Sequence, residues 1–429
     1  MAGIDRQTGA FALAAAVAAG GILALGADGA LASYAGGAAL CACALLAGGR
    51  ARMPSAFWLG LGTLGWLTVR TMGAETVGAE TVGANWWVAG PELAAMAGVA
   101  GAFAVGVQCG AEPERARRGA LVLTILLAAL AVLAFAGHVV SPDAVLGRPK
   151  PYHAGRLTGT FLSANTAATV CAAGLALGLA GLARAARGAG GVLRALEAVG
   201  RRGLAPGTLT VFAGACLLLT GSRGGILAGL CGAAVVLAPP GGLRGVRLPA
   251  LAGAGAVVVL AFAASGSVLG DRVADLGAGT SGRGALWSAS LDAWREAPVF
   301  GHGLGTFARA LAPHVTAETA PVLATQGAAH DFVLQWLVQT GLVGTAMGAA
   351  TLTALGVALA RGLRRRRGRW IVRAGLGALV VFVLHGLVDY AFEVPAATWA
   401  LAMLCGLGCG VAGGAGGAGA VRDRRSAPR

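Results

Sequence analysis

The apolar residues of this chain form long runs separated by short polar segments. About 20 consecutive apolar residues are enough for a helix to cross the hydrocarbon core of a bilayer. We predict twelve such helices, at residues 8–27, 30–48, 54–72, 90–110, 119–139, 158–182, 203–221, 223–239, 248–266, 331–359, 371–391 and 395–415. The first is expected to remain in the protein, because its apolar run is too long for a signal peptide. The predicted fold class is an all-α integral membrane protein.

One apolar run, "AAHDFVLQWLVQTGLVG" at residues 328–344, carries polar residues at helical spacing. Asp331, Gln335 and Gln339 lie four residues apart and therefore share one face of a helix. Such a face is costly against lipid, so we expect it to line the interior or a wet cavity, with His330 at its outer mouth. The alternative for Asp331 is that it only caps the start of the helix.

The longest connection, residues 267–329, divides the chain into three parts. Residues 1–266 are predicted to hold helices one to nine, residues 267–329 an external subdomain, and residues 330–429 helices ten to twelve with a basic tail. Within the subdomain, "RGALWSASLDAWREAPVFGHGLGTF" (283–307) places apolar residues at helical spacing. It predicts an amphipathic helix that ends at Pro298 and lies at the membrane interface through its tryptophans.

Composition supports the membrane class and narrows the chemistry. Hydrophobic residues make up 56% of the chain and charged residues 12%, whereas soluble domains carry roughly 25% charged residues. The 73 glycines favour close packing of membrane helices. All eight cysteines fall in apolar runs without histidine or acid at the same depth. We therefore expect packing cysteines and neither a metal nor another cofactor.

The net charge of +15 follows the predicted topology. With the N-terminus inside, 24 of the 33 lysine and arginine residues fall in cytoplasmic segments, as membrane proteins prefer. Both termini are then cytoplasmic, and the six histidines all fall toward the outer side. The positive charge is accounted for by topology and anionic lipid, so no nucleic-acid partner is expected.

Two arginines are predicted at outer helix ends. Arg156 precedes the helix that carries Asn165, and Arg223 follows Ser222 in a tight turn at the start of another helix. Arginine opposes the helix dipole at an N-terminus, but an anion bound there by the backbone N–H groups would reverse that balance. Snorkelling to lipid phosphates is the alternative. Two arginines and His330 around one outer cavity suit a lipid-linked diphosphate.

Successive segments of residues 155–396 resemble the superfamily of O-antigen ligases and O-antigen polymerases. They are "GRLTGTFLSANTAA", "TGSRGGIL", "AWREAPVFGHGLGTF", "AHDFVLQWLVQTGLVG" and "HGLVDYAFEVPA". The resemblance implies a polytopic transferase of the bacterial inner membrane. Such an enzyme moves a glycan from undecaprenyl diphosphate to a lipid or glycan acceptor at the periplasmic face, without a metal. It also implies that Arg156, Arg223 and His330 are the catalytic residues.

Two positions depart from the family pattern. Asp331 stands where asparagine is common, and Gln339 where glutamate is common. An acid beside His330 would raise the pKa of the histidine. Arg283 in the external loop is a candidate substrate contact together with Asp331, Asn165 and Gln335, while His385 and Asp389 are interpreted as a structural pair on the eleventh helix.

The predicted function is therefore an O-antigen-ligase-like glycan transfer to lipid A-core or a similar acceptor. A polymerase that uses the same donor is the first alternative. A polysaccharide transporter or lipid flippase is less favoured, because the charged residues lie near helix ends or in loops and not at the bilayer midplane.

Overall fold

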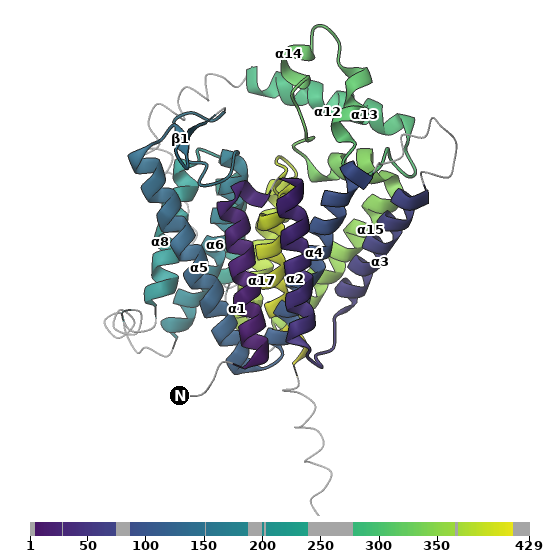
Figure 1. Cartoon of the computed structure of the whole chain (residues 1–429). Coiled ribbons are helices and arrows are strands. Elements are labelled where there is room, and N and C mark those ends of the chain that lie inside the picture. The colour runs from purple at the N-terminus through teal and green to yellow at the C-terminus, as the bar shows by residue number, and fades with distance from the viewer. Residues whose placement is uncertain are drawn as a thin grey trace, which may run out of the picture.

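The computed structural model describes residues 5–27, 29–73, 86–150, 152–187, 200, 203–238, 278–364 and 368–414, and these residues are almost entirely helical (Figure 1). The bundle helices are α1 (Arg6–Leu23), α2 (Ala30–Ala47), α3 (Ser55–Gly73), α4 (Trp86–Gly110), α5 (Pro113–Val140), α6 (Ala164–Ala185), α8 (Leu204–Leu219), α9 (Arg223–Leu237), α15 (Phe332–Gly362), α16 (Arg369–Gly386) and α17 (Pro395–Gly413). A two-residue strand pair, β1 (Ala144–Val145) and β2 (Arg148–Pro149), follows α5.

The predicted all-α membrane fold is confirmed. Among the described residues, eight helices are long and apolar enough to cross a membrane, and α8 and α9 are shorter apolar helices. Each predicted span overlaps one of the bundle helices except 248–266, which lies outside the described residues. The tandem "GAETVGAETVGA" repeat after α3 falls almost wholly outside them as well.

Two predicted helix limits are wrong. The span predicted at 158–182 begins as a helix only at Ala164, where the Ser163 hydroxyl accepts from the backbone N–H groups of Asn165 and Thr166. The span predicted at 371–391 ends at Gly386, so Asp389 lies beyond the helix that carries His385. In both cases apolar residues continue into a loop that the protein itself buries, a distinction that hydropathy alone does not make.

Glycines set the packing of the central helices α4 and α17. A Cβ on Gly406 would overlap the carbonyl oxygen of Phe103, and one on Gly410 would overlap that of Val107. Backbones can approach this closely only where side chains are absent. The Trp399 indole of α17 is buried and donates to the Ala95 carbonyl oxygen at 3.0 Å, which ties the same two helices together near their other ends.

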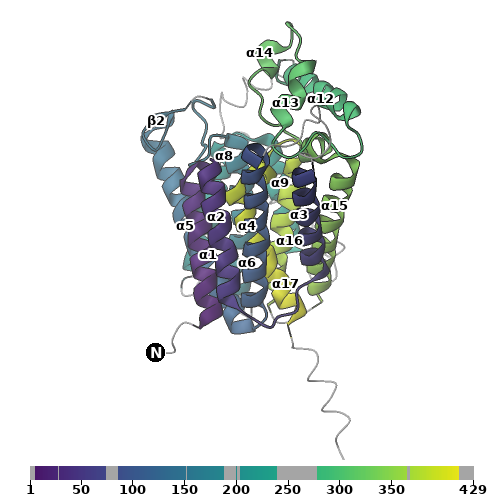
Figure 2. The ribbon, with the colours of Figure 1, turned by 45° about the vertical axis from the view of Figure 1, so that its right-hand side comes forward.

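Three short helices and one longer helix cover one end of the bundle, which we call the loop end (Figures 1 and 2). They are α12 (Ala278–Glu296), α13 (Phe307–Leu311), η3 (Ala312–His314) and α14 (Ala320–Leu323). The amphipathic helix predicted at 283–298 corresponds to α12. Its Leu286, Ala289 and Ala293 are buried in a separate apolar cluster that includes Val338 of α15. The Trp287 and Trp294 indoles donate to the carbonyl oxygens of Ala329 and Pro298, so they serve packing within the protein.

Helix α15 is broken at Gly341, whose φ of 61° lies in the left-handed region. The segment that follows α12 fills the break: Leu342 and Val343 donate to the carbonyl oxygens of Pro298 and Val299 at 2.9 and 3.1 Å. In return, His302 and Gly303 donate to the carbonyl oxygens of Val338 and Gln339 at 2.9 and 2.8 Å. The external segment is therefore hydrogen-bonded directly into a membrane helix, and every freed backbone group named here regains a partner.

Candidate functional site

Arg156 joins the loop before α6 to the turn between α8 and α9. Its side chain is only 4% exposed, and its Nε donates to the Thr220 carbonyl oxygen at 2.7 Å. Nη2 donates to Asn165 Oδ1 at 3.3 Å, and Nη1 lies 3.0 Å from Nδ1 of His153. The predicted neighbours Arg156 and Asn165 are thus in contact, and the guanidinium is held in place by three elements of the fold.

The turn that receives Arg156 leads directly into Arg223, the first residue of α9. Ser222 is the N-cap and accepts from the Gly225 N–H at 3.3 Å, while the Arg223 side chain is exposed. Arg223 makes no hydrogen bond or ion pair with any residue that the structure describes. The two predicted arginines therefore lie on adjoining turns at the loop end, one fixed by the protein and one extended toward solvent.

A buried polar group lies beneath the start of α9. Nε2 of His385 lies 3.3 Å from the Ser222 hydroxyl, and Nδ1 lies 2.7 Å from the Thr169 hydroxyl. The Asp389 carboxylate is completely buried, and burial raises its pKa to about 7. Neither Asp389 oxygen has a hydrogen bond of standard geometry with the described residues. His385 supports the N-cap of α9, and no hydrogen bond joins its imidazole to the carboxylate of Asp389, the partner expected from the sequence.

His330 lies directly before α15 with a φ of 52°, a conformation that is uncommon for a residue with a side chain. Its ring meets the Tyr390 ring edge to face, with centroids 4.8 Å apart. Burial and, to a lesser extent, the positive charge of Arg283 together lower the pKa of His330 to about 4. The expectation that Asp331 would raise this pKa is wrong.

Asp331 has a different task. Its Oδ1 accepts from the backbone N–H groups of Val333 and Leu334 at 2.8 and 3.1 Å, which makes it the N-cap of α15. Of the two interpretations of Asp331, the capping one is therefore confirmed. Gln335 is also occupied in positioning His330, because its Oε1 accepts from the N–H of the preceding Ala329 at 2.8 Å.

Arg283 of α12 lies close to His330, His385 and Asp389, although its own side chain is exposed. Its charge acts on three groups at once, lowering the pKa of both His330 and Asp389 and reaching His385 as well. The external subdomain therefore supplies a cation to the same region as Arg156 and Arg223. Lys150 adds a fourth cation there, since its Nζ donates to the Arg156 carbonyl oxygen at 2.6 Å.

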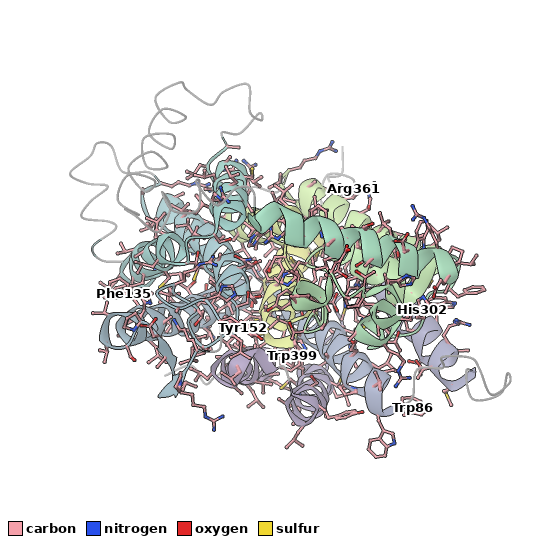
Figure 3. The ribbon with its side chains drawn as sticks, turned by 90° about the horizontal axis from the view of Figure 1, so that it is seen from above. Trp86, Phe135, Tyr152, His302, Arg361 and Trp399 are labelled. Atoms are coloured by element: carbon pink, nitrogen blue, oxygen red, sulfur yellow. The ribbon has the colours of Figure 1, made fainter. Side chains whose placement is uncertain are left out.

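A cavity of about 1410 Å³ opens at the loop end and continues between the bundle helices. His330 lines it, but the two arginines that were expected around the same cavity do not; Arg156 reaches it only through its contact with the lining residue His153. Its inner part is lined by apolar residues such as Phe103, Leu355 and Cys405. The larger polar residues of the lining include Glu92, Tyr152, His153, His330, Gln335, Gln339, Tyr390 and Glu393. Seen from the loop end, Tyr152 lies near the middle of the molecule, whereas Trp86 points away from it (Figure 3). Of the predicted wet face of α15, Gln335 and Gln339 line this cavity, whereas Asp331 does not.

The structure adds residues that the sequence did not indicate. His153 lines the cavity and also contacts Arg156, so it connects the cavity to the arginine side of the site. Glu92 and Glu393 face the same cavity from α4 and from the loop before α17. Glu92 and Glu393 are far apart in the sequence, and no spacing rule relates them. The only signal in the sequence was that each is an acidic residue in otherwise apolar surroundings.

Comparison with known proteins bears on the middle of the chain. A model of the O-antigen ligase family matches residues 208–349. The matched segment includes Arg223, Arg283 and His330, while Arg156 and the His385–Asp389 segment lie outside it. No curated protein matches the chain. The match confirms the resemblance drawn from the sequence motifs.

Proposed function

We propose that this protein transfers a glycan from undecaprenyl diphosphate to an acceptor hydroxyl. The match of residues 208–349 to the O-antigen ligase family and the membrane-spanning helices support this proposal. The observation that carries the proposal is the contact of Arg156 with the turn that begins α9, which brings it beside Ser222 and Arg223. We assign the loop end to the periplasmic face of the bacterial inner membrane and both termini to the cytoplasm, because the basic residues concentrate at the opposite end.

The donor diphosphate binds at the start of α9. Backbone N–H groups at a helix N-terminus bind anions, and the arginine guanidinium suits phosphate oxygens. Arg156 is preorganised by its hydrogen bond to Thr220, and Arg223 extends from the first turn. Negative charge grows on the diphosphate as it leaves, so fixed cations at this position stabilise the transition state more than the ground state.

His330 accepts the proton of the acceptor. The acceptor oxygen attacks the anomeric carbon, the bond from that carbon to the diphosphate oxygen breaks, and the hydroxyl proton moves to the imidazole. Attack from the side opposite the diphosphate inverts the anomeric carbon. Because the pKa of His330 lies at about 4, the imidazole is neutral and able to act as a base at neutral pH. Arg283 contributes a further cation near the reacting groups.

The direct test is the surface polysaccharide of a strain that lacks this protein. A ligase predicts that long glycan chains accumulate without attachment to the acceptor. A polymerase predicts single repeat units that are attached to the acceptor. Unchanged polysaccharide, or glycan that is trapped on the cytoplasmic side as loss of a flippase would cause, contradicts the proposal. Complementation with the wild-type chain and with the His330→Ala variant separates loss of catalysis from loss of the protein.

A further inference from the structure

The outer part of the cavity contains a pair of acids outside the proposed donor site. Glu92 projects from the second turn of α4, and Glu393 ends the short helix η4 (Ala391–Glu393) before α17. Both line the same cavity. Burial, together with the nearby charge of Glu92, raises the pKa of Glu393 to about 8. The cavity therefore contains a carboxyl that favours its protonated form at neutral pH, together with a second acid.

Protein groups satisfy this pair only in part. The Gly305 N–H and the Gln339 side chain face Glu92, and the Trp336 side chain faces Glu393. Oε1 of Glu393 is nevertheless buried without a hydrogen-bond partner among the described residues. Nδ1 of His330 and Oγ1 of Thr345, which line the same cavity, are also unpaired. Buried polar atoms are nearly always hydrogen-bonded, so three unpaired ones among the residues that line one cavity point to a ligand.

The chemistry of the cavity restricts that ligand. A protonated carboxyl both donates and accepts hydrogen bonds, which suits the hydroxyl groups of a sugar, and a second acid in the same lining opposes a diphosphate. The inner cavity, lined by Phe103, Leu355 and Cys405, suits an acyl chain. His330 lies in the wall of the same cavity, as does His153, which contacts Arg156. A sugar that is bound in the cavity is therefore in the compartment that the proposed base lines.

We propose that Glu92 and Glu393 form the acceptor subsite, where they bind the hydroxyl groups of a lipid-anchored sugar whose acyl chain occupies the inner cavity. The subsite rests on the proposed glycan transfer, which supplies the need for an acceptor beside His330. The two substrates are thereby assigned to different groups of residues. The diphosphate binds the arginines, and the sugar headgroup binds the two acids.

The test uses photoactivatable lipids and the full-length protein in phosphatidylcholine nanodiscs. A glucosyl diacylglycerol with a diazirine in its acyl chain should label peptides of α4 and α17 that line the cavity, and unlabelled glucosyl lipid should compete. A phosphatidylcholine with the same diazirine measures labelling that does not depend on the headgroup. Equal labelling by the two probes, or no competition, overturns the subsite.

Two variants test the acids separately. Glu92→Gln and Glu393→Gln should each reduce labelling by the glucosyl probe about five- to tenfold, because a hydrogen bond to an ionised group is roughly twice as strong as a neutral one. Glu318→Gln removes an exposed acid of the external subdomain and should leave labelling unchanged. Full labelling in both cavity variants overturns the proposal, even if one of them alone is poorly folded.

A polyprenyl diphosphate with a diazirine in its chain distinguishes failure of the acceptor subsite from failure of the proposed donor site. Its labelling should persist in the Glu92→Gln and Glu393→Gln variants, which also shows that they are folded, and should fall in Arg223→Ala. If this probe labels the cavity peptides of α4 and α17, the acceptor assignment is overturned while glycan transfer stands. If its labelling is indifferent to both Arg156 and Arg223, the proposed donor site fails instead.

Discussion

Nδ1 of His153 lies 3.0 Å from Nη1 of Arg156, and this contact joins the cavity wall to the arginine side of the site. His153 lines the cavity, and Arg156 donates a hydrogen bond to Thr220 in the turn before α9. The contact means that the two substrates of the proposed reaction bind to regions that share one hydrogen-bonded frame. Arg156 is consequently both a cation for the donor and a structural support.

The two arginines are therefore expected to differ on substitution. Arg223→Ala removes an exposed cation and should reduce transfer about tenfold or more, as loss of a charged hydrogen bond does, with an unchanged unfolding temperature. Arg156→Ala should reduce both transfer and the unfolding temperature, because it also releases the Thr220 turn. Transfer from lipid-linked donor and thermal unfolding measure the two effects. Arg309→Ala, which removes an exposed arginine of the external subdomain, is the control. Full transfer by Arg223→Lys would contradict the proposal that the guanidinium group of Arg223 binds the diphosphate.

His330→Ala should reduce transfer by roughly 10²–10⁴ while donor binding is retained, as expected for removal of a general base. Single-turnover transfer and binding of labelled donor measure the two quantities separately. His314→Ala, which removes a histidine paired with Glu296 in the external subdomain, is the matched control. An active His330→Ala enzyme excludes the base; weaker donor binding in parallel with transfer would make His330 a phosphate contact.

The rate of transfer should depend on pH through His330. The neutral imidazole is the active form, so the rate should fall only as the pH drops through about 4, the pKa of His330 in the folded protein. Arg283→Gln removes a charge that lowers this pKa, so the acidic limb should move to higher pH. Asp331→Asn retains a helix cap and should leave the limb in place. The rate of transfer against pH is measured for the wild type, Arg283→Gln and Asp331→Asn, with Arg295→Gln on the same helix as the control. If Arg283→Gln does not move the acidic limb, the charge of Arg283 does not set the pKa of His330.

The sequence predicted what depends on local pattern and missed what depends on the approach of distant segments. The alternation of apolar runs predicted the helices, whereas the catalytic roles that motif resemblance implies for His330 and both arginines stay predictions. The spacing of Asp331, Gln335 and Gln339 correctly indicated a cavity for the two glutamines, yet it did not reveal that Asp331 caps the helix and that Gln335 is bonded to the backbone before His330. Their role is to position the histidine, and only the fold brings those backbone groups within reach.

The pKa of His330 was predicted in the wrong direction for a related reason. Sequence places Asp331 beside it, but adjacency along the chain does not fix the direction in which a carboxylate points. In the structure that carboxylate turns to the helix N-terminus, while burial dominates the environment of the imidazole. The acids Glu92 and Glu393 escaped notice because they come together only when α4 packs near the start of α17.

Gly341→Ala should destabilise the protein. The glycine has a φ of 61°, and an added Cβ would overlap the backbone of Val299 and Phe300. Strain of this kind costs on the order of 1–3 kcal/mol before the loss of packing is counted. Gly356→Ala on the same helix is the control, because a Cβ there meets only Leu379 at 4.0 Å. Thermal unfolding in detergent measures both, and an unfolding temperature for Gly341→Ala equal to that of Gly356→Ala would show that the break is not required.

The assigned orientation is tested at Thr316, an exposed residue of the external subdomain. In a background with the eight native cysteines replaced by serine or alanine, Thr316→Cys should react with an impermeant maleimide in intact spheroplasts. A cysteine at Arg364, near the end of α15 at the opposite face, should react only after lysis. The reverse pattern would place the loop end in the cytoplasm and remove the periplasmic assignment.

The break in α15 makes the external segment and the membrane helix a single mechanical unit. Residues 298–303 and 338–343 exchange backbone hydrogen bonds across the break, and Gln339 lies in both the break and the cavity wall. A displacement of α12 is therefore transmitted to the cavity wall through rigid backbone and not through flexible side chains. For protein engineering, the loop is not a portable module: a chimera that exchanges acceptor preference between relatives has to carry residues 298–343 as one continuous block.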